Sequence, residues 1–399
     1  MSVLLYSALS KALSATYLDF VSVYVTEGGV TSFKSNSWLI FWLSIGLTFS
    51  ASSLVVRKLS RIKVKALSYP RISMEMGLAK IFIILALLLH ALNILLTRRI
   101  ALPATGIDRF NFWDIYAIPV QKIFGDLMLF VPLSCGILFT HGAVYNSRSA
   151  KRYGSIGFLS YICILVLEGQ RFHGLLLGLS LALGSYVIAM KASNQPLLNV
   201  KKYTYLAIGI AALLALLVSE FQHRGLASYA GGTGGAILYR VLVLQGHTFW
   251  SAYQHYATEG PSGAFLELFD GLNYTMKQTA TEQVLEGYEE KGINFATALP
   301  ATLIMIAGIT GVIVGSYFYG AIYGLIVVQL KRVVQRGEAF SAIFLTYAWQ
   351  NIHTVYAQAS LQPFINPTLW IAIVLYFLSR ISINSITKNS MPLKAQAKY

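Results

Sequence analysis

The chain has 399 residues, of which 56% are hydrophobic and only 12% are charged. A soluble domain carries about a quarter charged residues, so this composition excludes an ordinary soluble protein. The apolar residues occur in long blocks, and a block of about 18 or more residues with few charges predicts a membrane-spanning helix. Cys135 and Cys163 both lie inside apolar blocks, which argues against a disulfide framework and against a zinc site.

We predict an all-α polytopic integral membrane protein with about ten transmembrane helices. Lys11 and Asp19 interrupt the first span, and no cleavable signal peptide is expected there. The fifth and sixth spans are short enough to form a tilted or re-entrant pair around 169–173. The predicted spans are residues 3–25, 37–56, 77–97, 124–145, 154–168, 174–190, 203–219, 311–330, 339–358 and 367–386.

The formal net charge is +15, and the placement of its Lys and Arg residues along the chain predicts the orientation in the membrane. Short cytoplasmic loops are enriched in Lys and Arg, and alternate loops here carry most of the basic residues, with few acids beyond Glu75 and Glu338. Both termini are therefore expected in the cytoplasm, and the polar stretch 219–295 is expected on the outer face. The positive charge needs no nucleic acid to explain it.

This layout divides the chain into three parts. Residues 1–218 form an N-terminal bundle of about seven helices, 219–310 form one large outer loop with interfacial helices, and 311–399 hold the last spans and a cytoplasmic tail. Within the loop, Arg240 and His247 are seven positions apart, or two helical turns, which predicts one interfacial helix over 236–257 with both on one face.

One acidic and one basic residue lie where the fifth and sixth predicted spans meet. Glu168 and Arg171 lie three positions apart, so one helical turn would pair them. An ionisable group at membrane depth is costly and therefore a functional candidate. Arg171 would hold a phosphate, with Glu168 as its orienting group or as a base. The alternative is a structural ion pair that fixes the hairpin.

The start of the outer loop presents a second group of polar residues. Glu220, His223 and Arg224 share one helical face as the seventh span ends. A glycine-rich segment, 231–235, follows and would let backbone amides approach a phosphate or a sugar. The alternatives are a headgroup-contacting cluster and a flexible linker.

Two further segments carry candidate residues. Arg240 would bind a second phosphate, while Tyr239, His247 and Trp250 would contact sugar rings; an interfacial aromatic belt is the alternative for the aromatic residues. The ninth span holds a polar stripe with His353 beside it, which indicates either helix–helix contacts or a general base. The sequence has no Asp-x-Asp pair, so the expected chemistry is metal-independent, with arginines neutralising the leaving group.

In layout the chain resembles the O-antigen polymerase (Wzy-type) family of oligosaccharide repeat-unit polymerases. Arg224 and Gly235 meet that family's spacing of an arginine and a glycine eleven positions apart, whereas Arg171 has Ala182 at the corresponding place. The segment that follows the loop resembles the family's proline- and glycine-rich region, through Phe295, Pro300, Gly311, Gly315, Gly320 and Gly324.

The resemblance implies a GT-C-like glycosyltransferase of the bacterial inner membrane, without a cofactor. Its substrates would be glycans linked to undecaprenyl pyrophosphate and joined at the periplasmic face, and its other partners would be membrane lipids and a chain-length regulator protein. The pyrophosphate would contact Arg171, Arg224 and Arg240, and the base would be one of Glu168, His223 and His353. An O-antigen ligase and a polysaccharide flippase or other transporter are the alternatives.

Overall fold

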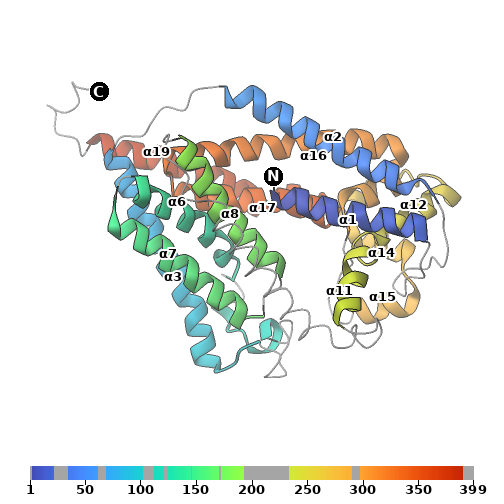
Figure 1. Ribbon diagram of the computed structural model, residues 1–399, viewed down its shortest axis with the longest axis horizontal. Coiled ribbons are helices and arrows are strands. Elements are labelled where there is room, and N and C mark those ends of the chain that lie inside the picture. The colour runs from blue at the N-terminus through green and yellow to red at the C-terminus, as the bar shows by residue number, and fades with distance from the viewer. Residues whose placement is uncertain are drawn as a thin grey trace. The chain divides into compact units, whose positions relative to one another are not determined.

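A computed structural model gives the fold, and it describes residues 2–21, 35–61, 69–101, 112–120, 125–144, 146–169, 172–192, 233–289 and 297–389. All regular elements in these ranges are helices (Figure 1). They are α1 (Ser2–Val21), α2 (Ser37–Ser60), α3 (Tyr69–Thr97), η2 (Phe112–Tyr116), η3 (Gly125–Phe130), α6 (Val131–Val144), α7 (Arg148–Leu167), α8 (Phe172–Ala192), α11 (Thr233–Leu242), α12 (His247–Glu259), α13 (Glu267–Asp270), α14 (Leu272–Thr279), α15 (Glu282–Glu289), α16 (Leu299–Arg336), α17 (Ser341–Ala357), α18 (Gln362–Ile365) and α19 (Pro367–Asn389).

Four of these helices are long and apolar enough to cross a bilayer, which indicates a helical membrane protein. They are Ser37–Ser60, Ile72–Thr97, Arg148–Leu167 and Leu299–Arg336. Shorter apolar helices cover Met128–Val144, Leu177–Lys191 and Pro367–Ser382. The predicted span 203–219 lies outside the described residues. The count of ten spans, the outer position of the loop and the three-part division remain predictions.

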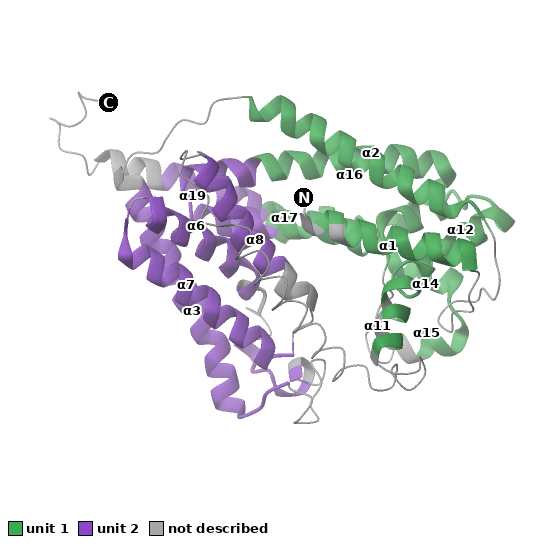
Figure 2. Cartoon of the chain, in the orientation of Figure 1, with its two compact units in different colours: residues 1–62, 224–328, 348–370 green, residues 63–223, 329–347, 371–399 purple. Residues whose placement is uncertain are grey.

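The chain forms two compact units, and each contains segments from distant parts of the sequence (Figure 2). Unit 1 contains Met1–Ile62, Arg224–Val328 and Ala348–Trp370. Unit 2 contains Lys63–His223, Gln329–Tyr347 and Ile371–Tyr399. Both units therefore depend on contacts between residues that are far apart in the chain.

In unit 1, α2 and α16 are in close contact through small residues. Gly320 and Gly324 lie one turn apart on α16, against the backbones of Thr48 and Ser52, which lie one turn apart on α2. A Cβ atom on Gly320 would be 2.8 Å from Cα of Thr48, so a side chain there would push the helices apart. Nearby, the hydroxyl groups of Ser44 and Ser316 are 2.7 Å apart. Small residues of this kind allow membrane helices to pack backbone to backbone.

The helix α16 is broken near its start. Gly308 has φ 64° and ψ −160°, a conformation that glycine adopts readily. The amides of Ser262 and Gly263 donate to the carbonyl oxygens of Met305 and Ile306 at 2.9 Å each, and so satisfy groups that the break releases. The predicted span 311–330 falls within the part of α16 that follows this break. The part before the break begins at Leu299, with Pro300 in its first turn, where proline is tolerated.

The predicted single helix over 236–257 is wrong, because the chain turns between α11 and α12. Gly246 lies against the backbone of α1, where a Cβ atom would collide with Lys11 and Ala15. The Gly246 amide donates to the hydroxyl of Ser14 at 2.7 Å. The turn is therefore held by α1, and the seven-residue spacing of Arg240 and His247 does not place them on one face of one helix.

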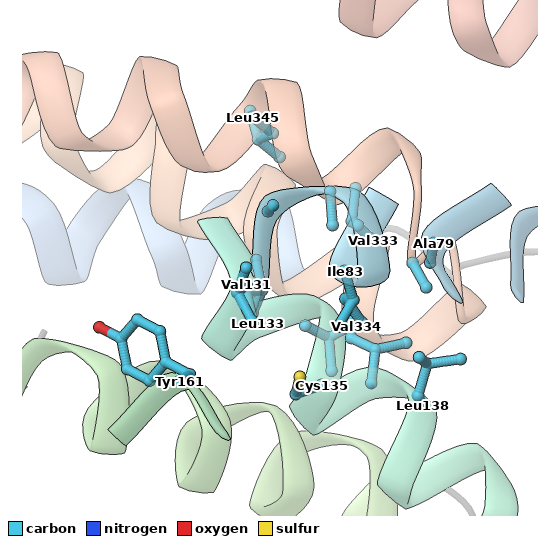
Figure 3. Close-up of a cluster of buried hydrophobic side chains, with 14 of the residues drawn as sticks. Ala79, Ile83, Val131, Leu133, Cys135, Leu138, Tyr161, Val333, Val334 and Leu345 are labelled. Carbon is cyan, nitrogen blue, oxygen red and sulfur yellow. The ribbon is translucent and has the colours of Figure 1, made fainter. Parts of the chain in front are cut away.

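Unit 2 is built around α6, which packs against both α7 and α8. Buried side chains of α3, α6, α7, α16 and α17 form its core, including Ile83, Cys135, Tyr161 and Val334 (Figure 3). Gly154 of α7 sits against the α6 backbone, where a Cβ atom would be 2.7 Å from the carbonyl oxygen of Cys135. Close packing of these helices fixes the ends of α3 and α7, where the candidate site lies.

At the N-termini of two helices, the first residues donate hydrogen bonds to a carboxylate from another helix. In unit 1, Asp19 at the end of α1 accepts a hydrogen bond of 2.6 Å from the hydroxyl of Ser37, the first residue of α2. In unit 2, Glu75 of α3 accepts from the amides of Phe340 and Ser341 at 2.9 and 3.0 Å and from the Ser341 hydroxyl at 2.7 Å. Both carboxylates satisfy amides that a helix leaves unbonded at its N-terminus.

The other acid expected among the basic loops is also buried. Glu338 has a fully buried side chain whose carboxylate lies 3.6 Å from Arg336 Nη1 and 3.3 Å from Arg380 Nε. The Arg380 guanidinium lies over the ring of Tyr376. These contacts tie the end of α16 to α19 within unit 2, as pairing does for most buried charges.

Candidate functional site

The strongest group of polar residues lies in unit 2, where α3 and α7 end. Nδ1 of His90, on α3, is 2.7 Å from Oε1 of Glu168, and both side chains are only 1% exposed. Glu168 occupies the C-terminal cap of α7, and its amide donates to Ile164 at 2.9 Å. Gly169 follows with φ 67°, a left-handed conformation that commonly ends a helix.

His90 is the partner of Glu168 that the structure describes, and the pairing of Glu168 with Arg171 remains a prediction. Arg171 lies outside the described residues. The imidazole and the carboxylate lie close enough to share a proton, and a buried pair of this kind holds each group in one orientation. An ionisable pair within apolar helices is a functional candidate.

Asn93 lies one turn from His90 on α3 and is fully buried. Its Oδ1 atom accepts a hydrogen bond of 2.9 Å from the amide of Ile118. In the part of the chain that the structure describes, its Nδ2 atom has no hydrogen-bond partner. Leaving a buried donor unsatisfied costs about 1–3 kcal/mol, so the position is suited to an acceptor atom from a ligand or a water molecule.

The described parts of the segment after α3 are attached to α3 and α7 beside this group. The amide of Ala101 donates to the carbonyl oxygen of Leu167 at 2.8 Å, and the Arg99 guanidinium lies 5.4 Å from the centre of the Tyr116 ring. These contacts place an arginine and an aromatic ring on the segment that also holds the Asn93 amide. They fall in the region between the third and fourth predicted spans, which the basic-loop pattern assigns to the outer face.

Several predicted site residues cannot be placed. His223 and Arg224 lie outside the described residues, as does Arg171. Arg240 lies on α11, and nothing is described of its side chain. The expected role of these arginines at a pyrophosphate remains a prediction.

The predicted sugar-contacting residues of unit 1 are mostly in its core. Trp250 is fully buried and packs with Leu18 and Val243, and Tyr239 packs against the same cluster. His247 is 1% exposed, with Nδ1 2.9 Å from the carbonyl oxygen of Leu244. Contact of Trp250 with a sugar remains a prediction, and it would require the side chains that cover this ring to move.

His353 is held in a stack of aromatic residues in unit 1. Its ring is parallel to that of Trp349, with ring centres 5.8 Å apart. The Trp349 indole nitrogen donates to the hydroxyl of Tyr323 at 3.0 Å, and Tyr319 contacts both Tyr323 and Tyr356. His353 is 5% exposed, and its part in catalysis remains a prediction.

Lys11 lies next to this stack, although the sequence indicated only an interruption of the first span. Its side chain is buried, its Nζ atom donates to Ser7 Oγ at 3.2 Å, and it lies 5.8 Å from the centre of the Tyr356 ring. The hydroxyl of Tyr356 is buried and has no hydrogen-bond partner among the described residues.

On α12, burial and the neighbouring Tyr256 and Asp19 raise the pKa of Tyr253, which keeps that phenol protonated.

An apolar groove of about 470 Å³ lies beside the break in α16. Its walls come from the 261–265 segment and from the residues on both sides of Gly308, and none of the lining residues is charged. They are Pro261, Gly263, Phe265, Ile306, Ala307, Thr310, Gly311 and Val314. The groove suits a hydrocarbon chain better than a sugar or a phosphate.

The described ranges contain no group of three or more His, Cys, Asp or Glu residues placed to hold a metal ion. The residues that the sequence interpretation missed, His90 and Asn93, stand inside the third predicted span. A histidine and an asparagine in an otherwise apolar span are costly, and this was the signal that could have found them.

One family matches part of the chain: a family of unknown function (DUF6418), over residues 267–373. The match runs from α13 into α19 and includes His353 and the break at Gly308, while His90, Asn93 and Glu168 lie outside it. No curated protein and no solved structure gives a significant match.

Proposed function

We propose that the chain is an integral-membrane glycosyltransferase that joins lipid-linked oligosaccharide repeat units, as O-antigen polymerases do. In this reaction a hydroxyl of the acceptor sugar attacks the anomeric carbon of the donor glycan. The donor's bond to undecaprenyl pyrophosphate breaks, and the pyrophosphate leaves with the bonding electrons. The reaction needs a proton acceptor for the hydroxyl and cationic groups for the leaving pyrophosphate.

The observation that carries the proposal is the buried His90–Glu168 pair, 2.7 Å apart, at the ends of α3 and α7. General acid–base catalysis requires a titratable group in a fixed position, and it contributes about 10²–10⁴ in rate. The same turn is followed in the sequence by Arg171, a residue type suited to bidentate phosphate binding. A base and a guanidinium are thus only three positions apart in the sequence.

The break in α16 supports an enzyme over a transporter. Transporters commonly break helices near the middle of the membrane, where the substrate binds. Here about 28 residues follow Gly308 within α16, or about 42 Å at a rise of about 1.5 Å per residue. That length alone exceeds the roughly 30 Å hydrocarbon core of a bilayer. The break therefore belongs near a membrane surface, where the head group of a lipid-linked substrate would lie.

The proposal is tested in a host strain that lacks the chromosomal copy of this chain and carries it on a plasmid. Surface glycan is separated by gel electrophoresis. The wild-type copy should give a ladder of chain lengths, and the deletion should leave single repeats attached. Glu168→Gln should reduce the ladder toward single repeats, while Glu286→Gln, at an exposed acid of α15, should keep it.

The other outcomes identify the alternatives. Complete loss of attached glycan in the deletion strain indicates a ligase. Lipid-linked repeats retained on the cytoplasmic face indicate a flippase. A full ladder of chain lengths in the deletion strain would refute the proposed function.

A further inference from the structure

We infer that His90 is the general base of the proposed reaction and that Glu168 is its positioning residue. The inference rests on the proposed function and adds a catalytic residue to it. Among the predicted candidate bases that the structure describes, Glu168 lies at this point, with its carboxylate oxygen 2.7 Å from Nδ1 of the histidine.

The inferred role requires one particular arrangement of protons in the pair. With Glu168 ionised, its carboxylate can only accept, and Nδ1 of His90 carries the hydrogen in the bond to Glu168 Oε1. The lone pair of the neutral imidazole then lies on Nε2, on the opposite side of the ring. A carboxylate at Nδ1 fixes this tautomer and stabilises the imidazolium that forms when Nε2 takes a proton.

Asn93 adds a second, independent indication of a ligand. Its Nδ2 atom is a buried donor without a hydrogen-bond partner in the described parts of unit 2, and it lies on the same face of α3 as His90. An oxygen atom of the acceptor sugar would satisfy this donor. The Asn93 amide is held in place, because its other atom, Oδ1, accepts from Ile118 at 2.9 Å.

The step conserves atoms and charge. Nε2 of His90 removes the proton from the acceptor hydroxyl as its oxygen forms a bond to the anomeric carbon of the donor. The bond from that carbon to the pyrophosphate oxygen breaks, and the oxygen keeps the electron pair. His90 holds the proton as an imidazolium beside the Glu168 carboxylate and then releases it to water.

The decisive variant is His90→Asn, because the asparagine amide can occupy the place of Nδ1 and still donate to Glu168. It keeps the contact that a structural role would need and removes Nε2. The assay uses the full chain, purified in lipid nanodiscs, with lipid-linked repeat units extracted from the deletion strain. We expect kcat to fall about 10²–10⁴-fold, with KM and the melting temperature close to those of the wild type.

The chain offers a matched control at its surface. His255 and Glu259 form a second pair on α12, with Nδ1 3.5 Å from Oε1 and side chains 16% and 66% exposed. His255→Asn should leave kcat unchanged. His90→Gly, which leaves space for a free base, should recover part of its rate when imidazole is added; a purely structural role would give no such recovery.

The possible results separate this inference from the proposed function. A wild-type chain that does not extend glycans removes the reaction, and this inference with it. If the wild type extends glycans and His90→Asn does so at the same rate, His90 is not the base, and the proposed function stands. A loss of rate that accompanies a large loss of melting temperature in His90→Asn, with no imidazole rescue in His90→Gly, assigns the pair to structure and also overturns the inference.

Discussion

The carboxylate of Glu75 gives a sharp test of how unit 2 is held together. In Glu75→Ala, the amides of Phe340 and Ser341 lose their acceptor at the buried start of α17. Each buried donor left unsatisfied costs about 1–3 kcal/mol, so the two together cost about 2–6 kcal/mol. Glu75→Gln should cost less, because one carbonyl oxygen remains to accept from them. Against a typical total stability of about 5–15 kcal/mol, the alanine variant removes a large fraction.

The assay is thermal unfolding of the purified chain in detergent. The quantity measured is the fraction of monodisperse protein that remains after heating to each temperature. Glu75→Ala should lower the melting temperature by about 5–15 °C, with Glu75→Gln between it and the wild type. The matched control is Glu286→Ala, which removes an exposed acid of α15 and should change little. If Glu75→Ala has the same melting temperature as the wild type, the Glu75 carboxylate does not stabilise the start of α17.

Three further predictions concern packing and charge. Gly320→Leu should separate α2 from α16 at Thr48 and lower the yield of folded protein by several-fold, measured by size-exclusion chromatography. Arg380→Met should destabilise the chain by about 1–3 kcal/mol in a denaturation series, because it removes one partner of the buried Glu338 while Arg336 remains 3.6 Å away. Trp250→Ala should cost about 3–5 kcal/mol if this ring belongs to the core; an unchanged melting temperature with reduced sugar binding would favour the predicted contact with sugar instead.

The long apolar helices could be predicted from the sequence because hydropathy is a local property. The predicted spans at 37–56, 77–97 and 154–168 all fall on helices that are long and apolar enough to cross a bilayer. The predicted span 311–330 also falls on such a helix, in the part of α16 after Gly308, but the break at Gly308 was not predicted. A glycine breaks a helix only where other groups take up the released carbonyls, and Ser262 and Gly263 supply these from a separate segment.

The candidate site was predicted only in part. Glu168 stood out because it is an acid at the end of an apolar span. Its partner, His90, is 78 positions away, and no local spacing predicts a contact over that distance. The turn between α11 and α12 was missed for a similar reason, because it is imposed by Gly246 resting on the backbone of α1.

The attachment of the 261–265 segment to α16 uses backbone atoms on both sides. Such an attachment places few demands on side chains. Proline at 262 or 263 would remove a donor, and Gly263 has a φ of 68°, which favours glycine at that position. The walls of the neighbouring groove can therefore change in size and shape while the segment stays fastened. Mutagenesis of Phe265 can thus be used to alter what the groove accepts, separately from whether the chain folds.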